Sequence, residues 1–285
     1  MGPLTSPSVI REVMERHGVT FTKALGQNFL INPSVCPRMA RLGGAGPGVG
    51  VLEIGPGAGV LTAQLAQMAD RVVAVELDGR LLPVLAETLA EYENIKVIHG
   101  DALKLDLGRL LREEFGAMPV VVCANLPYYI TSPLVMALLE QRLPVESITV
   151  MVQKEAAQRI CAGPGTRQAS ALGVAVAYYS APKLLFSVSR GSFLPAPEVD
   201  SAVIRLDIRK TPPVEAADEA RFFAVVRGAF QQRRKTVLNS LSAALDIPKE
   251  ALGPVLAAAG VPQNAEALSL EDFAAIAGGL GSPGA

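Results

Sequence analysis

Tryptophan is absent from this chain, and the residue types that often mark metal or disulfide sites are few. Aromatic residues make up 5% of the 285 positions, with three cysteines and two histidines. Cys36, Cys123 and Cys161 stand far apart without metal-ligand spacing, which argues against a zinc motif and favours free thiols in a reducing compartment. His17 and His99 have no ligand partner near them in the sequence. We therefore predict no metal site.

An excess of one charge and long apolar runs are lacking as well. The chain carries 26 Lys and Arg against 27 Asp and Glu, a net charge of −1, so any nucleic-acid surface must be local. No apolar run approaches the roughly 18 residues of a membrane span, and a secretory leader pattern is missing. These absences predict a soluble cytoplasmic protein, whose length suits one large α/β domain and a smaller one.

What the chain does contain is an apolar strand followed by a glycine turn and an amphipathic helix. Residues 51–54 predict a buried strand, and Gly55, Gly57 and Gly59 alternate in the turn after it. Glycines allow close backbone approach to a ligand, and the first turn of a helix has free N–H groups. The arrangement is therefore typical of a nucleotide-cofactor site.

The acid that would complete such a site is Glu76, which ends the next predicted strand 21 residues after Gly55. A carboxylate there can accept hydrogen bonds from both hydroxyls of a ribose, in a nicotinamide cofactor as in S-adenosylmethionine. The Gly-x-Gly-x-Gly order, with Pro56 in the turn, favours S-adenosylmethionine, which has no pyrophosphate. A third strand leads to Asp101, whose side chain can reach an adenine amine. The alternative for Asp101 is that it caps the following turn.

A second polar cluster begins at the end of the fourth predicted strand, an apolar run that ends in Asn125. The exocyclic amine of a base is a poor nucleophile, because its lone pair is delocalised into the ring. The side-chain oxygen of Asn125 and the backbone carbonyl of Leu126 can each accept one amine hydrogen, which favours the pyramidal nitrogen of a transition state. Pro127 fixes the backbone, and Tyr128 offers a face for base stacking. These four residues are the candidate catalytic site; the alternative is a polar turn after a core strand.

The last part of the chain has a different pattern. A proline-containing linker at residues 210–213 precedes four helical patterns, which predicts a boundary there. The predicted helices span residues 215–230, 235–245, 249–259 and 269–277. We expect a cofactor-binding domain over residues 1–210, with an arm over 1–48, and a helical domain over 211–285. Five basic residues and no acid occur between residues 221 and 245. A charge run is more often a solvated face, but this local imbalance favours contact with phosphates.

Taken together, these motifs resemble the ribosomal RNA adenine dimethyltransferases, most of all the bacterial small-subunit, kasugamycin-resistance type. The resemblance covers nearly the whole chain in the family's order, although Tyr129 stands where relatives often carry Asn or Lys. The segments that carry it are Gly-Gln-Asn-Phe-Leu at 26–30, Glu-Ile-Gly-Pro-Gly-Ala-Gly at 53–59, Glu76, Gly-Asp-Ala at 100–102, Asn-Leu-Pro-Tyr at 125–128, Phe-Leu-Pro-Ala-Pro at 193–197 and Arg-Arg-Lys at 233–235.

The resemblance implies a Rossmann-like, seven-stranded methyltransferase sheet with a small helical domain after it. It implies S-adenosylmethionine as methyl donor and dimethylation of two adjacent adenosines near the 3′ end of small-subunit (16S) ribosomal RNA, by a monomer acting on a partly assembled 30S subunit. The cofactor contacts would be Asn28, Leu30, Gly55, Gly57, Glu76, Asp101, Ala102 and Asn125. The candidate RNA contacts are Arg167, Phe193, Arg233, Arg234 and Lys235.

Three other functions share parts of this pattern. The large-subunit adenine methyltransferases of macrolide resistance have similar motifs, but Leu126, Tyr128 and the loop at residues 163–170 favour the small-subunit type. A glutamine or DNA-adenine methyltransferase would carry Pro in place of Leu126. An RNA-binding assembly factor of the same fold would not depend on methyl transfer, whereas the intact cofactor motifs favour retained chemistry.

Overall fold

The computed structural model describes residues 2–19, 28–125, 127–232 and 234–281. Contacts between Cα atoms divide the chain into two compact units, here called the sheet unit (1–157 and 183–208) and the helical unit (158–182 and 209–285). Residues 158–182 group with the helical unit because the helix that they contain packs against a helix of the C-terminal part. The functional division at residue 210 stays a prediction.

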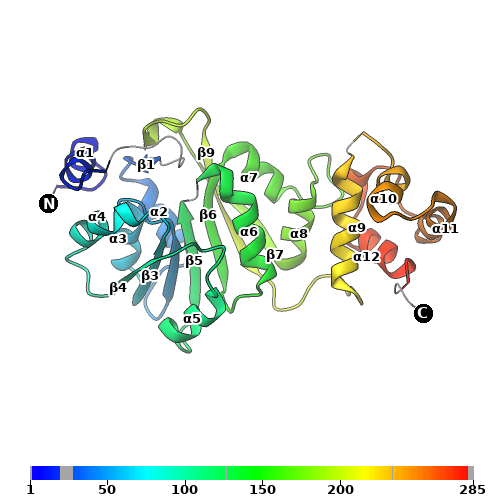
Figure 1. The fold of residues 1–285 in the computed structure, drawn as a ribbon, viewed down its shortest axis with the longest axis horizontal. Helices are drawn as coiled ribbons and strands as arrows, with labels where there is room; N and C mark the ends of the chain where they lie inside the picture. Colours follow the sequence, from blue (N-terminus) through cyan, green and yellow to red (C-terminus); the bar gives the residue numbers. More distant parts are fainter. Residues whose placement is uncertain (1, 20–27, 126, 233, 282–285) are drawn as a thin grey trace. The chain divides into compact units, whose positions relative to one another are not determined.

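A seven-stranded mixed sheet forms the centre of the sheet unit, as the sequence predicts (Figure 1). Four neighbouring pairs, from β4 to β6, are parallel, and the late strand β9 lies antiparallel to β6. The chain order reverses between β2 and β5, which places a ligand crevice at their carboxyl ends. In spatial order the strands are β4 (Ile95–His99), β3 (Arg71–Glu76), β2 (Gly50–Ile54), β5 (Val120–Asn125), β6 (Ser147–Gln153), β9 (Ser201–Ile208) and β7 (Ser180–Val188).

The central strands are buried along their whole length. Every residue of β2 is buried, and so are five of the six in β3 and in β5. Apolar runs of this kind are typical of parallel strands with both faces covered. The covering helices include α2 (Val35–Gly43) and α3 (Val60–Ala66), which pack on each other, with α2 also contacting β5 and β6.

Helix α2 approaches the sheet closely at its last residue. A Cβ atom added to Gly43 would lie 2.8 Å from Sγ of Cys123 in β5, so only glycine fits there. The sequence did not indicate α2, nor the two short helices that come directly before and after β4 in the chain. The remaining helices of this unit are α1 (Pro7–Arg16), α4 (Leu82–Thr88), α5 (Leu107–Phe115), α6 (Thr131–Glu140) and the start of α7 (Lys154–Cys161).

Because Ser132 stands directly before Pro133, the sequence predicts it as the cap of a helix over residues 132–141. In the structure Ser132 does not cap this helix, α6. The helix already begins at Thr131, directly after the 3-10 turn η3 (Tyr128–Ile130), so Ser132 lies inside its first turn. A second expectation also shifts: α9 begins at Glu219 rather than at residue 215, because the side chain of Asp218 accepts a hydrogen bond from the backbone N–H of Arg221.

Besides the end of α7, the described residues of the helical unit form five helices, with α9 contacting α8, α10 and α12. An aromatic cluster joins α8 to α9: the rings of Tyr179 and Phe223 stack with centroids 5.3 Å apart, and Tyr178 lies tilted against Phe222 at 5.0 Å. Among the described residues no helix is long and apolar enough to cross a membrane. The helices are α8 (Ala171–Tyr179), α9 (Glu219–Gln231), α10 (Val237–Leu245), α11 (Lys249–Ala259) and α12 (Leu270–Gly279).

Candidate active site

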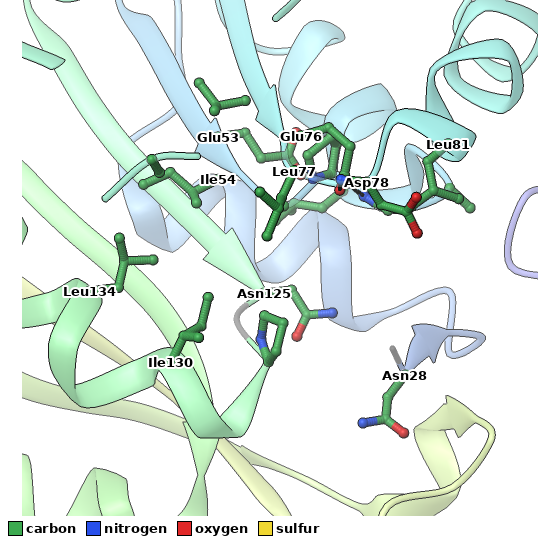
Figure 2. Close-up of a pocket in the computed structure, with 18 of the residues that line it drawn as sticks. Asn28, Glu53, Ile54, Glu76, Leu77, Asp78, Leu81, Asn125, Ile130 and Leu134 are labelled. Atoms are coloured by element: carbon green, nitrogen blue, oxygen red, sulfur yellow. Dashed lines mark hydrogen bonds between the residues drawn. The ribbon is translucent and has the colours of Figure 1, made fainter. Parts of the chain in front are cut away.

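A cavity of about 480 Å³ opens at the carboxyl ends of the parallel strands. This volume lies within the range of sites for small ligands, roughly 300–1,000 Å³. Figure 2 shows Asn125 at the end of its strand, with Asn28 on one side and the carboxylates of Glu53 and Glu76 on the other. The structure brings together at this cavity Asn28, Leu30, Gly55, Gly57, Glu76, Asp101, Ala102, Asn125, Pro127, Tyr128 and Phe193.

The glycine turn has a backbone that other residues rarely adopt. Gly55, Gly57 and Gly59 have φ angles of +71°, +61° and +85°. Three left-handed residues at alternate positions explain why the motif is Gly-x-Gly-x-Gly. Within this turn the N–H of Gly57 donates a hydrogen bond to Oε2 of Glu76 at 3.2 Å. This hydrogen bond connects the turn after β2 with the last residue of β3.

Glu76 is held rigidly at the cavity wall. Its Oε1 accepts a hydrogen bond from the N–H of Asp78 at 2.8 Å, and its side chain is nearly buried. Burial raises the pKa of Glu76 above its ordinary value, while the two backbone hydrogen bonds offset part of that rise. Each oxygen retains a further lone pair, so the carboxylate can still accept hydrogen bonds from a ligand.

Glu53 is a second carboxyl group in the wall, and it is absent from the residues predicted for the site. It lies in the otherwise apolar strand β2 and is 1% exposed. Among the described residues its Oε2 atom has no hydrogen-bond partner. Burial, together with the negative charge of Glu76, raises the pKa of Glu53 to about 8. The signal in the sequence was the single acid of a buried strand, directly before the glycine turn.

The charge of the cavity has one sign. Four of its lining residues are acids, and none of the described lining residues is Lys, Arg or His. A cationic ligand fits such a wall, whereas an anionic pyrophosphate would be repelled. The acids are Glu76, Asp78 and Asp101, together with Glu53, which adds its charge only above its raised pKa of about 8.

Asp101 lines the cavity and also caps a turn. Its Oδ1 accepts a hydrogen bond from the N–H of Leu103 at 3.0 Å, and its Oδ2 lies 3.5 Å from Nζ of Lys104. The turn-capping alternative raised for this residue is therefore confirmed. The same hydrogen bond holds the carboxylate at the cavity wall.

The candidate catalytic residues begin with Asn125, the last residue of β5, which is the strand next to β2. Ile54 pairs with Ala124 in the ladder, so Asn125 stands beside the start of the glycine turn. Pro127 continues the wall, and Tyr128 begins the 3-10 turn η3. Leu126 lies outside the described residues, so the role of its carbonyl stays a prediction, and the side chain of Tyr129 is likewise not described.

The hydroxyl of Tyr128 has a partner that the sequence did not reveal. It lies 2.8 Å from Oγ of Ser201, the first residue of β9 and 73 positions away in the chain. Burial is the main cause that raises the pKa of Tyr128 above its ordinary value, so the phenol stays protonated at neutral pH. No local pattern could have indicated this contact, because it depends on where β9 enters the sheet.

The candidate RNA contacts fall in different places. Phe193 is 3% exposed and faces the cavity rather than the outer surface. Arg167, Arg234 and Lys235 are exposed side chains of the helical unit. Arg233 lies outside the described residues, and the RNA roles of all five remain predictions.

Comparisons with known proteins agree on one family. The sequence profile of the family described as "Ribosomal RNA adenine dimethylase" matches residues 18–276. The "Ribosomal RNA small subunit methyltransferase A" of Alkaliphilus oremlandii is 45% identical over 283 residues, covering 98% of this chain and 99% of that protein. The protein of the same name from a Geobacillus species is 46% identical over 283 residues, covering 97% of each chain.

Two solved structures share the fold over most of the chain. A dimethyladenosine transferase from Plasmodium falciparum has a TM-score of 0.73 at 26% identity, covering 87% of this chain and 95% of that one. The 23S rRNA methyltransferase ErmE has a TM-score of 0.67 at 30% identity, covering 89% of this chain and 99% of its own.

Proposed function

Because this chain belongs to the ribosomal RNA adenine dimethylase family, we propose that it transfers methyl groups from S-adenosylmethionine to two adjacent adenosines near the 3′ end of small-subunit ribosomal RNA. One observation carries the proposal. Asn125, Pro127 and Tyr128 line the same cavity as the glycine turn and Glu76, so an acceptor base and a cofactor would meet there.

The residues present fit S-adenosylmethionine. Glu76 would accept hydrogen bonds from the ribose hydroxyls, and Asp101 from the adenine amine. The glycine turn leaves room for the ligand, and the acidic wall suits its positive charge. When bound, this cofactor supplies an electrophilic methyl group on a sulfonium.

The chain's own contribution to the transfer is to orient and polarise the target amine. The side-chain oxygen of Asn125 accepts one amine hydrogen, and the carbonyl of Leu126 is proposed to accept the other. Both interactions strengthen as the nitrogen becomes pyramidal, so they favour the transition state over the ground state. Tyr128 stacks on the base and holds it in the cavity. No dedicated base is required, because the amine becomes acidic only after it carries the extra methyl group.

The sequence similarity to proteins named as small-subunit enzymes supports small-subunit ribosomal RNA as the substrate. The matched proteins from Alkaliphilus and Geobacillus are named for the ribosomal small subunit. We propose a partly assembled 30S subunit as the substrate, bound by a cytoplasmic monomer. The exposed Arg167, Arg234 and Lys235, with Arg233 and Phe193, are the proposed RNA contacts.

The test is mass spectrometry of ribosomal RNA after incubation with this protein and S-adenosylmethionine. Small-subunit particles from a strain lacking this modification should gain four methyl groups on two neighbouring adenosines. Asn125→Ala serves as the matched inactive control, since it removes the proposed amine partner. Particles that gain no methyl group, with an active reference enzyme in parallel, would contradict the proposal.

A second candidate is methylation of large-subunit RNA. It is favoured by the likeness to ErmE at 30% identity and a TM-score of 0.67. The same assay with 23S RNA distinguishes the two, because methyl groups on 23S RNA alone would select this function. Tight binding to small-subunit particles without methylation of either RNA would instead select an assembly factor.

A further inference from the structure

One segment of the chain touches both sides of the cavity. At its start, β8 (Phe193–Leu194) pairs antiparallel with β1 (Phe29–Leu30), the strand that follows Asn28. Oγ of Ser192 accepts a hydrogen bond from Nδ2 of Asn32 at 3.1 Å, and its carbonyl accepts one from the N–H of Ile31 at 2.9 Å. At its end, Ser201 meets the hydroxyl of Tyr128. The segment between residues 192 and 201 thus links the cofactor side of the cavity to the acceptor side.

The position of Ser201 is fixed by strand pairing and by hydrogen bonds of the residue before it. It is completely buried, and it pairs with Gln153 at one end of the ladder between β6 and β9. The carbonyl of the preceding residue, Asp200, accepts a hydrogen bond from the N–H of Lys154 at 2.9 Å. The carboxylate of Asp200 accepts one from the N–H of Arg190 at 3.0 Å. The serine hydroxyl is therefore a fixed point of the sheet.

Tyr128 is in a different situation. It stands in a 3-10 turn after the end of β5, and its ring is half-buried at the cavity wall. A ring attached only through its Cβ can turn about two side-chain torsions. The hydrogen bond of 2.8 Å to Ser201 holds the far end of the ring as well. A ring held at both ends keeps its long axis in one direction, and a planar base stacks only on a ring that lies in a suitable position.

We propose that Ser201 is a positioning residue for methyl transfer: through the hydroxyl of Tyr128 it fixes the direction of the ring on which the target adenine stacks. The inference rests on the proposed function, in which Tyr128 receives the base. It adds that the phenol hydroxyl is needed for catalysis, although this hydroxyl does not touch the reacting atoms. Preorganisation of this kind lowers the barrier because the ring does not have to be ordered during the reaction.

The test is a double-mutant cycle with Ser201→Ala, Tyr128→Phe and the double variant, on unmethylated small-subunit particles with saturating S-adenosylmethionine. Each single change should lower kcat about 3- to 10-fold, the range for one net hydrogen bond. The double variant should be no slower than the slower single variant, because both remove the same interaction. Ser201→Thr, which keeps the hydroxyl, should restore most of the rate.

Readouts other than rate separate positioning from a structural role. The melting temperature and the Kd for S-adenosylmethionine should stay near the parent values, and the KM for the particles should change less than about twofold. Ser147→Ala is the matched control: Ser147 is also completely buried, pairs with Asp207 at the other end of the same ladder, and donates to the carbonyl of Gly43 at 3.4 Å. It should keep the parent kcat.

The outcomes divide clearly. Parent-like rates for Ser201→Ala and Tyr128→Phe, with a slow Tyr128→Ala, would overturn the inference and leave the proposed function standing. Multiplicative effects of the two changes, or an equal loss in Ser147→Ala, would also overturn it. A parent protein that methylates no particle would refute the proposed function, and the inference with it.

Discussion

The structure gives its most detailed expectation of a stability effect for the change Glu53→Gln. The folded protein holds the carboxyl group with a pKa of about 8, against an ordinary value of 4.5. Between these two values the folded chain keeps a proton that the unfolded chain has released. Rising pH therefore favours the unfolded state, by about tenfold in the folding equilibrium for each pH unit. Above about pH 8 the folded chain ionises too, and this dependence ends.

The measurement is urea unfolding of parent and Glu53→Gln at several pH values between 5 and 8, without cofactor. Glutamine has nearly the same shape and no titrating proton, so the difference between the two proteins isolates this group. The parent should lose stability relative to the variant as pH rises through the window. Glu93→Gln, a change at an exposed glutamate, controls for the loss of one carboxylate. A difference that is flat with pH, or that grows in favour of the parent, would refute the reasoning.

Three further predictions concern the site. Glu76→Ala should weaken S-adenosylmethionine binding in calorimetry by on the order of 1.5–3 kcal/mol, the range for a hydrogen bond to a charged group; tight NAD binding instead would contradict the cofactor assignment. Asn125→Ala should lower turnover at saturating cofactor ~10²–10³-fold with little effect on particle affinity, and a parent-like rate would exclude the proposed mechanism. Replacing Arg233, Arg234 and Lys235 together by Ala should make particle binding less sensitive to salt. The slope of log binding constant against log salt concentration should fall by about 0.7 to 0.9 for each lost phosphate contact, with cofactor affinity unchanged. An unaltered slope would mean that these residues form a solvated face.

The parts of the fold that sequence reasoning predicts well are those with a local cause. Strands β2, β3 and β5 are mainly apolar because both of their faces are covered. The glycine turn is recognisable because its alternate residues have φ angles open mainly to glycine. The four C-terminal helices keep a helical spacing of apolar residues, and α11 has the predicted bounds, Lys249–Ala259.

The parts that sequence reasoning misses depend on distant contacts. Helix α2 contains Pro37 and ends in glycine, so its local propensity is poor, and packing on α3 and the sheet stabilises it. Glu53 is read as a strand residue, because only the folded structure reveals that its carboxyl group lines the cavity and that, among the described residues, its Oε2 has no hydrogen-bond partner. The contact of Tyr128 with Ser201 joins positions 73 residues apart, beyond any local pattern.

The place of β9 between β6 and β7 has a consequence for the order in which the enzyme is completed during synthesis. The strands β2 to β4, the glycine turn and Asp101 have all been made well before the middle of the chain. By contrast, β6 has no neighbour on its outer side until residues 201–208 emerge. A nascent chain that has not yet made β9 already contains the strands and the glycine turn of the cofactor side of the cavity. Beside them the edge of β6 is unpaired, and such an edge is a site for mispairing. The same late strand closes that edge and brings Ser201 to Tyr128, so the acceptor side of the cavity is finished last.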